Sequence, residues 1–195
     1  MLAAIWIPSM RTQLGILSAA YLLGSIPFAR LFGRSRDPGV AARCATLILD
    51  FAEGYAAVWL AARLTQSNIH WMTYAALAVI LGHMFPIWTA FRGRHGVATA
   101  AGAFTAICWQ AVALDFGVWI VMVWFWGFAA IGSLAAAAAL PLLLYLLYAP
   151  GHAPPTVLSA SALLATALIV LKHRPNIARL IAGTEPRFSL RRPKI

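Results

Sequence analysis

Long apolar stretches separated by short polar segments dominate the chain. The sequence divides into apolar stretches at roughly Leu14–Phe32, Cys44–Leu64, Trp71–Ala90, Val97–Leu114, Phe116–Ala130, Ser133–Tyr148 and Thr156–Leu171. A helix needs about 20 apolar residues to cross the hydrocarbon core of a bilayer. The strict alternation of apolar and polar residues that is typical of membrane β-strands is absent. The pattern therefore predicts an all-α polytopic membrane protein with about seven transmembrane helices in a single domain, residues 1–195.

The region Gly96–Pro150 is the hardest to divide, because Asp115 is its only charged residue. As one helix it would be about 80 Å long at 1.5 Å per residue, whereas the bilayer core is about 30 Å thick. It therefore has to turn back. We predict one break at Leu114–Gly117, which makes Asp115 a loop or cap residue on the outer side. We predict a second break at Ile131–Ser133, with Pro141 as a kink inside the next helix.

Basic residues are distributed unevenly among the segments that connect the predicted spans. The segments Gly33–Arg43 and Phe91–Gly96 and the C-terminal tail carry most of the Lys and Arg residues, and only Arg11 and Arg63 fall on the other side. Because basic loops stay in the cytoplasm, seven spans place the N-terminus outside and the C-terminus in the cytoplasm. Six spans would put the tail on the opposite side from the other basic loops.

Composition and charge agree with this picture. Hydrophobic residues make up 62% of the 195 residues and charged residues only 10%, whereas an ordinary soluble domain carries about 25% charged residues. Basic loops beside anionic lipid account for the net charge of +10 without nucleic acid. Cys44 and Cys108 have no metal-ligand spacing, and no P-loop or serine-hydrolase motif is found. Neither a metal nor a cofactor is expected.

The segment Phe91–Gly96 combines glycines with basic side chains. Glycines allow a tight turn, and exposed N–H groups before a helix favour an anion. Arg92, Arg94 and His95 add positive charge. The segment is therefore either an anion-binding site or a basic anchor at the cytoplasmic face.

Three ionisable residues lie inside predicted spans. Asp50 and Glu53 are three residues apart and so share a helix face, and His83 lies late in the third span. Charged residues within a membrane usually face the bundle interior and mark a site. In the alternative interpretation, the two acids pair with Arg43 or another loop arginine, and His83 is a hydrogen-bonded packing residue.

Three segments, in the same order, resemble one family. They are YLLGSIPFARLFGR (Tyr21–Arg34), LGHMFPIWTAFRGRHGVAT (Leu81–Thr99) and HRPNIARLIAGTE (His173–Glu185). The family is that of the bacterial integral-membrane acyl-phosphate:glycerol-3-phosphate acyltransferases of the PlsY type. The resemblance implies a multi-pass protein of the bacterial cytoplasmic (inner) membrane. It also implies transfer of a fatty acyl group from acyl phosphate to the 1-hydroxyl of glycerol 3-phosphate, which gives lysophosphatidic acid for phospholipid synthesis.

The resemblance also implies a set of site residues. The catalytic candidates are His95, His173, Asn176 and Ser133, and the candidates for binding substrate phosphate are Ser35, Gly39, Arg92, Gly93, Arg94, Gly96, Thr99 and Arg174. Arginine side chains and backbone N–H groups bind phosphate well. Because an acyl phosphate is already activated, positioning and charge neutralisation can supply much of the catalysis. The implied partners are acyl phosphate, glycerol 3-phosphate and membrane lipids.

Several positions depart from the family pattern. The first loop has Ala41, Ala42 and Ala45 where the family has Thr, Asn and Arg, and both Glu53 and His95 stand where it has lysine. Lysine is charged throughout the physiological range, whereas an unperturbed histidine titrates near ~6.5. We therefore expect reduced or pH-shifted activity. Two alternatives stay open: a catalytically impaired paralogue that binds lipid or a partner, and, disfavoured by the lack of an internal repeat, a small transporter.

Overall fold

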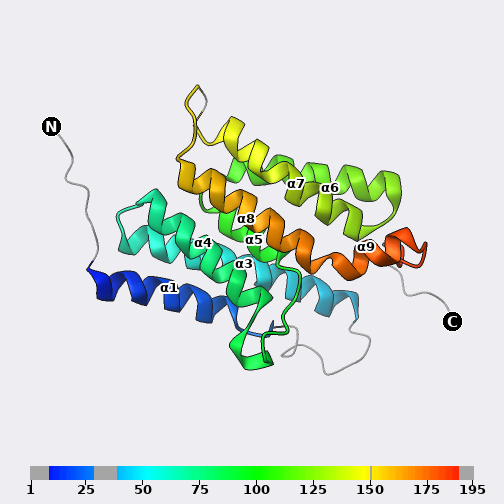
Figure 1. Ribbon diagram of the computed structural model, residues 1–195, viewed down its shortest axis with the longest axis horizontal. Helices are drawn as coiled ribbons and strands as arrows, with labels where there is room; N and C mark the ends of the chain where they lie inside the picture. Colours follow the sequence, from blue (N-terminus) through cyan, green and yellow to red (C-terminus); the bar gives the residue numbers. More distant parts are fainter. Residues whose placement is uncertain (1–8, 29–38, 150, 189–195) are drawn as a thin grey trace.

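The computed structural model describes residues 9–28, 39–149 and 151–188. Along the chain it contains α1 (Met10–Gly24), α3 (Val40–Leu64), α4 (Ile69–Met84), the 3-10 turn η1 (Ile87–Thr89), α5 (Val97–Thr105), α6 (Trp109–Trp126), α7 (Ala129–Leu147), α8 (Thr156–Lys172) and α9 (Arg174–Ile181). These ranges contain no strand. The long helices run beside one another along the long axis of the molecule, and α9 continues from α8 after a bend of 55° (Figure 1). The predicted all-α class is confirmed.

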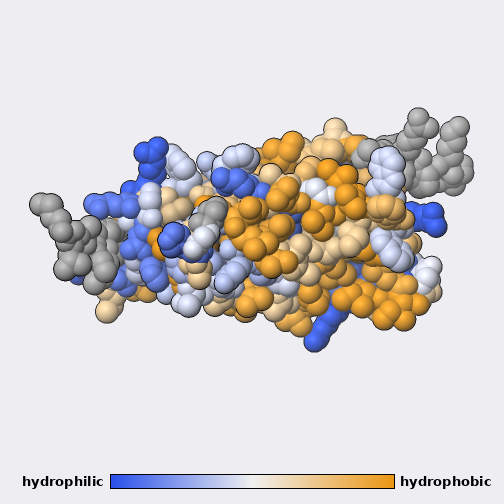
Figure 2. Space-filling view, turned by 90° about the horizontal axis from the view of Figure 1, so that it is seen from above, coloured by the Kyte–Doolittle hydropathy of each residue, from blue (hydrophilic) through white to orange (hydrophobic). Residues whose placement is uncertain are grey.

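Apolar helices give the protein its membrane character. Within the described ranges, the segments long and apolar enough to cross a membrane are Val40–Leu64, Ile69–Thr89, Trp109–Trp126 and Ala129–Leu147, and the bent α8–α9 pair qualifies as a fifth if it is one span. Helices α1 and α5 are shorter, with 15 and 9 residues. In Figure 2, apolar side chains cover the middle of the visible face, and hydrophilic side chains gather toward its two ends.

The predicted break at Leu114–Gly117 is wrong. Asp115 lies inside α6 and is buried, because an acid within a membrane helix can be held against the bundle interior. The chain turns earlier, at residues 106–108, between α5 and α6. Helix α6 then ends at Gly127, whose φ of 75° lies in the left-handed region that glycine adopts readily. The predicted spans Val97–Leu114 and Phe116–Ala130 are corrected accordingly.

The predicted break at Ile131–Ser133 is also wrong, because these residues lie inside α7. Gly132 serves close packing here and not a turn. A Cβ on Gly132 would lie 3.0 Å from the carbonyl oxygen of Trp119 and 2.6 Å from a methyl group of Val123, both on α6. Pro141 lies inside α7 as predicted.

Prolines explain two further shifts of the span boundaries. Helix α1 ends at Gly24 and α4 at Met84, shortly before Pro27 and Pro86. The predicted spans ran on through these prolines, although proline cannot supply the N–H that continues a helix. Helix α3 begins four residues before the predicted Cys44, at Val40. The final predicted span agrees with α8 to within one residue, and the tail adds the unpredicted helix α9.

Glycines let α3 and α5 approach closely. A Cβ on Gly54 of α3 would lie 2.1 Å from the carbonyl oxygen of Thr99, and a Cβ on Gly102 of α5 would lie 1.9 Å from that of Phe51. Helices in a bilayer gain little from apolar burial against each other, so close backbone packing is a main source of their association. Since Gly54 follows Glu53, the same contact fixes the position of that acid against α5.

Replacing Gly102 with alanine tests this contact. The added Cβ would force α3 and α5 apart, and we expect it to reduce the free energy of unfolding by ~1–3 kcal/mol. The matched control is Gly117→Ala on α6, where nothing lies within 4 Å of the added Cβ. Its stability should be unchanged or higher, because alanine favours the helix over glycine. Equal thermal unfolding midpoints for the two variants in detergent would contradict the close contact.

Candidate functional site

One end of the bundle gathers segments from across the sequence. The Tyr21 hydroxyl at the end of α1 donates to the carbonyl of Phe85, just after α4, at 2.7 Å. The ammonium of Lys172 at the end of α8 lies 4.2 Å from the centre of the Phe85 ring. In the tail, the amide of Phe188 donates to the carbonyl of Gly127, between α6 and α7, at 2.7 Å. The ends of α1, α4, α6 and α8 therefore lie at the same end of the molecule.

The turn Phe91–Gly96 lies at this end and is held tightly against α4. The amide of Gly93 donates to the carbonyl of Met84 at 3.2 Å. A Cβ on Gly93 would lie 2.1 Å from the carbonyl oxygen of His83, so no other residue fits there without displacement. Gly96 has a φ of 77° and immediately precedes α5. The tight turn predicted from these glycines is thus present.

Arg94 points from this turn into the bundle. Its guanidinium donates to Oδ2 of Asp50 on α3 at 2.5 Å. The Asp50 side chain is buried, whereas that of Arg94 is 45% exposed. The interpretation in which an acid of this span pairs with a loop arginine therefore holds for Asp50. The guanidinium supplies the opposite charge that a buried carboxylate needs.

Glu53 lies on the same face of α3 and contacts Nδ1 of His83 on α4 through Oε1. The Thr99 hydroxyl of α5 donates to the same oxygen at 2.9 Å. All three side chains are buried. When Glu53 is ionised, its carboxylate can only accept hydrogen bonds, and Nδ1 of His83 then carries the proton. Nε2 lies 3.9 Å from Oδ2 of Asp50, too far for a hydrogen bond.

A small pocket of about 80 Å³ opens beside these residues. Its polar lining comes from Asp50, His83, Arg92, Gly93 and Arg94, and its apolar lining comes largely from the segment that follows α1. Two arginines, one histidine, one aspartate and one glycine thus border the same space. Such a set can bind a small anionic group.

Asp50, Glu53 and His83 also form a potential metal-ligand set, since one ligand atom of each lies within 4.8 Å of the others. Internal pairing already occupies these atoms. A divalent ion would have to displace Arg94 from Asp50 and open the contact between His83 and Glu53. The second oxygen of Glu53, Oε2, is buried without a hydrogen-bond partner among the described residues. The geometry fits a group held by internal contacts better than an ion site.

His95 points away from Arg94, toward α9. Its Nε2 donates to Oδ1 of Asn176 at 3.1 Å, and Nδ2 of Asn176 donates to Oε1 of Glu185 at 2.7 Å. Arg179 donates to the other oxygen of Glu185 at 2.7 Å. The rings of His95 and His173 lie 4.4 Å apart, measured between their centroids. The structure thus brings together His95, His173 and Asn176, which the sequence placed in two separate motifs.

Glu185 and Arg179 belong to this second group but were not among the predicted site residues. Both lie within the third segment of the resemblance, and the spacing across the Gly183 turn was the available signal. The Glu185 carboxylate accepts from the amide of Asn176, which leaves Oδ1 of Asn176 to accept from His95.

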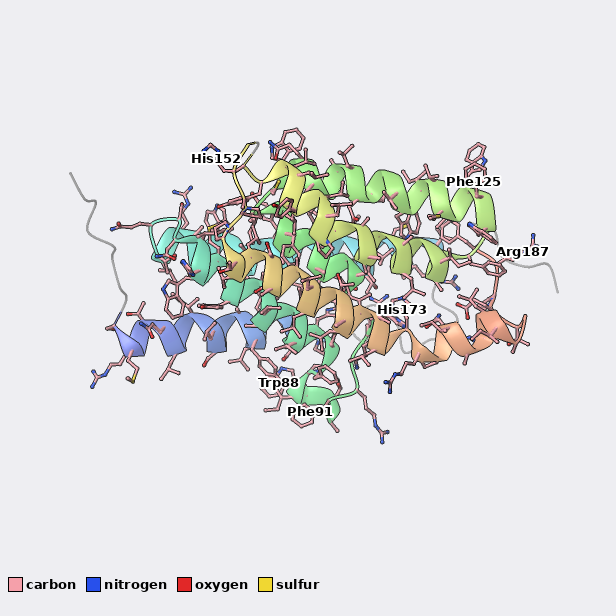
Figure 3. All side chains as sticks on the ribbon, turned by 45° about the horizontal axis from the view of Figure 1, so that its top comes forward. Trp88, Phe91, Phe125, His152, His173 and Arg187 are labelled. Atoms are coloured by element: carbon pink, nitrogen blue, oxygen red, sulfur yellow. The ribbon has the colours of Figure 1, made fainter. Side chains whose placement is uncertain are left out.

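His173 is fixed where α8 meets α9 (Figure 3). Its Nδ1 donates to the carbonyl of Ile169 at 2.8 Å. In the neutral ring, Nε2 is therefore the unprotonated nitrogen, with a lone pair that can accept a hydrogen bond. Burial lowers the pKa of His173 below its usual value. Partial burial of the His95 ring, together with the positive charges around it, also lowers the pKa of His95. Both rings are therefore mostly neutral at pH 7 until an anion binds and favours their charged forms.

The remaining candidates lie around these two groups. Ser133 on α7 accepts from the indole N–H of Trp119 at 3.4 Å, and no hydrogen bond joins it to either group among the described residues. Arg174 is exposed at the start of α9, and Gly39 caps the start of α3. Ser35 lies outside the described residues. The structure therefore places most, but not all, of the predicted residues at one end of the bundle.

Comparisons with known proteins agree with this arrangement. A family model described as glycerol-3-phosphate acyltransferase matches residues 35–183. Glycerol-3-phosphate acyltransferases of Mesorhizobium japonicum and Bordetella pertussis are 35% and 38% identical, and the alignments cover 85% and 93% of this chain and 90% and 94% of those proteins. None of these matches supports a transporter or a protein without enzymatic activity.

Two solved structures are also similar. Both are crystal structures of PlsY, an integral membrane glycerol 3-phosphate acyltransferase, one in the glycerol 3-phosphate form and one in the lysophosphatidic acid form. Their TM-scores are 0.78 and 0.80, with sequence identities of 30% and 29%. The alignments cover 91% and 92% of this chain and 96% of each PlsY chain.

Proposed function

The chain belongs to the glycerol-3-phosphate acyltransferase family, and we propose that it transfers a fatty acyl group from acyl phosphate to the 1-hydroxyl of glycerol 3-phosphate. The products are lysophosphatidic acid and inorganic phosphate. The observation that carries the proposal is the convergence of Arg94, His95, His173 and Asn176 at one end of the bundle, beside a pocket with two arginines. Donor, acceptor and leaving group all contain phosphate, so a cationic site serves the whole reaction.

The two groups suit different parts of the substrates. Arg92, Gly93 and Arg94 line the pocket next to the buried acids, where they can bind the phosphate of glycerol 3-phosphate. His95 and His173 offer two imidazoles to a second phosphate, which would favour their charged forms. We assign the acyl phosphate to this second group. Gly39, Gly96, Thr99, Arg174, Ser133 and Ser35 remain candidates for supporting contacts.

The acyl chain has a matching place on the surface between α1 and α3. An apolar groove of about 230 Å³ follows α1 from Thr12 to Leu23 and α3 from Ala57 to Leu64. At 1.5 Å per residue, the α1 side extends over ~17 Å, comparable to a long fatty acyl chain. Leu23 adjoins Gly24, which lines the polar pocket. An acyl chain in this groove would keep its activated carbonyl close to the polar end of the bundle.

The topology we propose has seven spans, with the N-terminus outside and the C-terminus in the cytoplasm of a bacterial inner membrane. The chain reverses direction at each connection from α1 through α8. The contacts described above accordingly bring the C-terminal ends of every second helix, α1, α4, α6 and α8, to the same end of the molecule. The basic turn Phe91–Gly96 and the basic tail then lie on one side, as cytoplasmic segments should. Helix α5 extends only ~14 Å at 1.5 Å per residue, so it crosses about half of the hydrocarbon core by itself.

An assay with purified protein, acyl phosphate and glycerol 3-phosphate tests the proposed reaction. We expect product formation, with a KM that rises between about pH 5.5 and 8, because the lowered pKa leaves His95 uncharged toward the alkaline end and phosphate prefers the cation. His95→Lys should flatten this rise, since lysine stays charged.

His173→Ala should abolish transfer, and Asn176→Ala should weaken it by the ~0.5–1.5 kcal/mol of a hydrogen bond. Absence of product from both the native and the His95→Lys proteins, across about pH 5–9, would contradict the proposal.

Donor chain length tests the acyl groove. Gly15 lines the groove and has nothing within 4 Å of an added Cβ, so Gly15→Phe should occupy part of it. We expect kcat/KM for a 16-carbon acyl phosphate to fall at least ~10-fold relative to a 10-carbon donor, because lost methylene contacts each cost up to ~1 kcal/mol. Gly117→Phe, at a similarly open glycine of α6, is the matched control. An unchanged ratio in Gly15→Phe would place the acyl chain elsewhere.

Reporter fusions test the topology. Fusions after Arg34, His95 and Arg187 should all report a cytoplasmic location, because the basic segments share one side. A fusion within Thr65–Asn68 serves as the control and should report the outside. A periplasmic signal at Arg187 alone would remove one span from the region between Gly96 and Pro150.

A further inference from the structure

We propose that His95 and His173 form a binding site for a divalent cation that prefers imidazole ligands, such as Zn²⁺, and that the bound ion blocks acyl transfer. The two rings come from the turn before α5 and from the junction of α8 and α9, and their centroids lie 4.4 Å apart. Imidazole nitrogen is a preferred ligand of Zn²⁺, Cu²⁺ and Ni²⁺. The binding site is independent of the reaction, whereas its inhibitory effect rests on the proposed function.

His173 presents one ring nitrogen in the way that a metal ligand requires. Its Nδ1 donates to the carbonyl oxygen of Ile169, which can only accept, so Nε2 is the unprotonated nitrogen of the neutral ring. Metal-binding histidines almost always donate their other ring N–H to a carbonyl or carboxylate oxygen, because that bond fixes the ring and raises the basicity of the ligand nitrogen. The orientation of the His173 ring is therefore set before an ion arrives.

His95 has the same arrangement. Its Nε2 lies 3.1 Å from Oδ1 of Asn176, and the direction of that amide is fixed because its Nδ2 donates to Oε1 of Glu185 at 2.7 Å. The guanidinium of Arg179 donates to the other oxygen of Glu185 and favours its ionised form, which can only accept. Nε2 of His95 is therefore the donor, and Nδ1 is the unprotonated nitrogen of the neutral ring.

The spacing of the two rings is close to that of a pair on one shared ion. With Zn–N distances of ~2.0–2.1 Å and tetrahedral geometry, two imidazoles on one zinc ion have centroids about 5 Å apart. The observed pair therefore has to open by less than ~1 Å to hold the ion. His95 lies on an exposed turn and can supply this shift. Two water molecules would complete the tetrahedron.

Charges around the pair select the kind of ion. The Glu185 carboxylate acts on His173 and attracts a cation. The positive charges of Arg94 and Lys172 act on His95 and oppose it. An ion held mainly by charge, such as Mg²⁺, gains little here, and Mg²⁺ also prefers oxygen ligands. An ion that forms strong bonds to imidazole is favoured instead.

The buried acids beside His83 are the competing location for the ion. One ligand atom each from Asp50, Glu53 and His83 lies within 4.8 Å of the others, but these atoms are already engaged with each other and with Arg94. By contrast, no hydrogen bond among the described residues uses Nδ1 of His95 or Nε2 of His173. The imidazole pair can therefore accept an ion without breaking an internal contact.

A metal ion and the acyl phosphate need the imidazole pair in different states. In the proposed reaction the two rings bind a phosphate, which favours their charged forms with N–H groups as donors. A metal ion binds the lone pairs of neutral rings. The two ligands therefore exclude each other, and bound Zn²⁺ should raise the KM for acyl phosphate without lowering kcat.

Titration of the purified full-length protein with Zn²⁺, without a histidine tag and without substrate, tests the site directly. We expect one ion per chain, and Co²⁺ bound in its place should show the visible absorption of a tetrahedral complex. His95→Lys should weaken Zn²⁺ binding at least ~100-fold, and Asn176→Ala should weaken it ~10-fold through its contact with His95. His152→Ala, in the exposed loop before α8, is the matched control and should bind as the native protein does.

Two results of the titration would overturn the site. One is the absence of Zn²⁺ binding by the native protein at millimolar concentration. The other is binding that His83→Gln removes and His95→Lys retains, because the ion would then lie among the buried acids. The thermal unfolding midpoint of each variant checks folding, and the exposed position of His95 makes its replacement the safest of the set.

Inhibition is measured in the acyl transfer assay at buffered concentrations of free Zn²⁺. We expect half-inhibition of the native protein to need more Zn²⁺ as acyl phosphate is raised, and a chelator to restore the rate. His95→Lys should need at least ~10-fold more Zn²⁺ than the native protein, and Mg²⁺ at the same concentration should not inhibit. Inhibition that is independent of acyl phosphate, or equal in His95→Lys, would contradict competition at this pair.

The outcomes separate this inference from the proposed function. A native protein that binds Zn²⁺ through His95 and His173 but forms no lysophosphatidic acid overturns the proposed function and leaves the site in place. A native protein that is active and binds no Zn²⁺ overturns only the site. An active protein that binds Zn²⁺ at this pair without inhibition overturns the claim that the ion blocks acyl transfer.

Discussion

The ion pair between Arg94 and Asp50 ties the polar end of the protein to its membrane-embedded helices. A carboxylate in the interior of a helical bundle needs a partner, and the nearest source of positive charge is the turn that precedes α5. Once Arg94 is drawn inward, the backbone of the turn is fixed against α4 by Gly93 and its bond to Met84. His95, the next residue, is thereby directed toward α9. One buried acid thus determines where the side chains of Arg94 and His95 lie.

In the reaction that we propose, this arrangement divides the chemistry between two adjacent residues. The Arg94 side leads to Asp50, Glu53 and His83, where an imidazole sits beside cations in a small pocket. The His95 side leads to His173 and Asn176, where two imidazoles are close enough to share an anion. Because the turn is short and rigid, substrates bound on its two sides are held at a fixed separation. Acyl transfer between two phosphate-bearing molecules needs such fixed geometry more than it needs a strong nucleophile.

The sequence predicted those features that depend on a single local cause. Apolar length identified most of the helices. The one-sided distribution of Lys and Arg predicts an orientation in the membrane, which stays a prediction. The sequence-based prediction failed at residues whose type is compatible with more than one structural role. The sequence pattern predicts a loop at Asp115, whereas the structure buries this residue within α6. It predicts a turn at Gly132, whereas this glycine serves the contact between α6 and α7. Neither case can be decided without knowing which helices touch.

The site shows the same limit. The motifs placed His95, His173 and Asn176 in one set, and the structure brings them together. Pairings such as Glu53 with His83 join residues 30 positions apart, and the sequence offered only their location in neighbouring spans. The motifs say which segments meet, but the choice of partner among several polar groups depends on side-chain direction, and that is set by tertiary packing.

Glu53 shows how a reversed charge can be tolerated beside a phosphate site. A carboxylate facing a bound phosphate would repel it, and Glu53 stands where the family has a lysine. In the structure, Glu53 does not line the pocket, because His83 and Thr99 lie against its oxygen. The residues Arg92 and Arg94 line the pocket instead. The Glu53 carboxyl therefore reaches the pocket only through the His83 ring, and any direct repulsion of a bound phosphate falls with the greater distance.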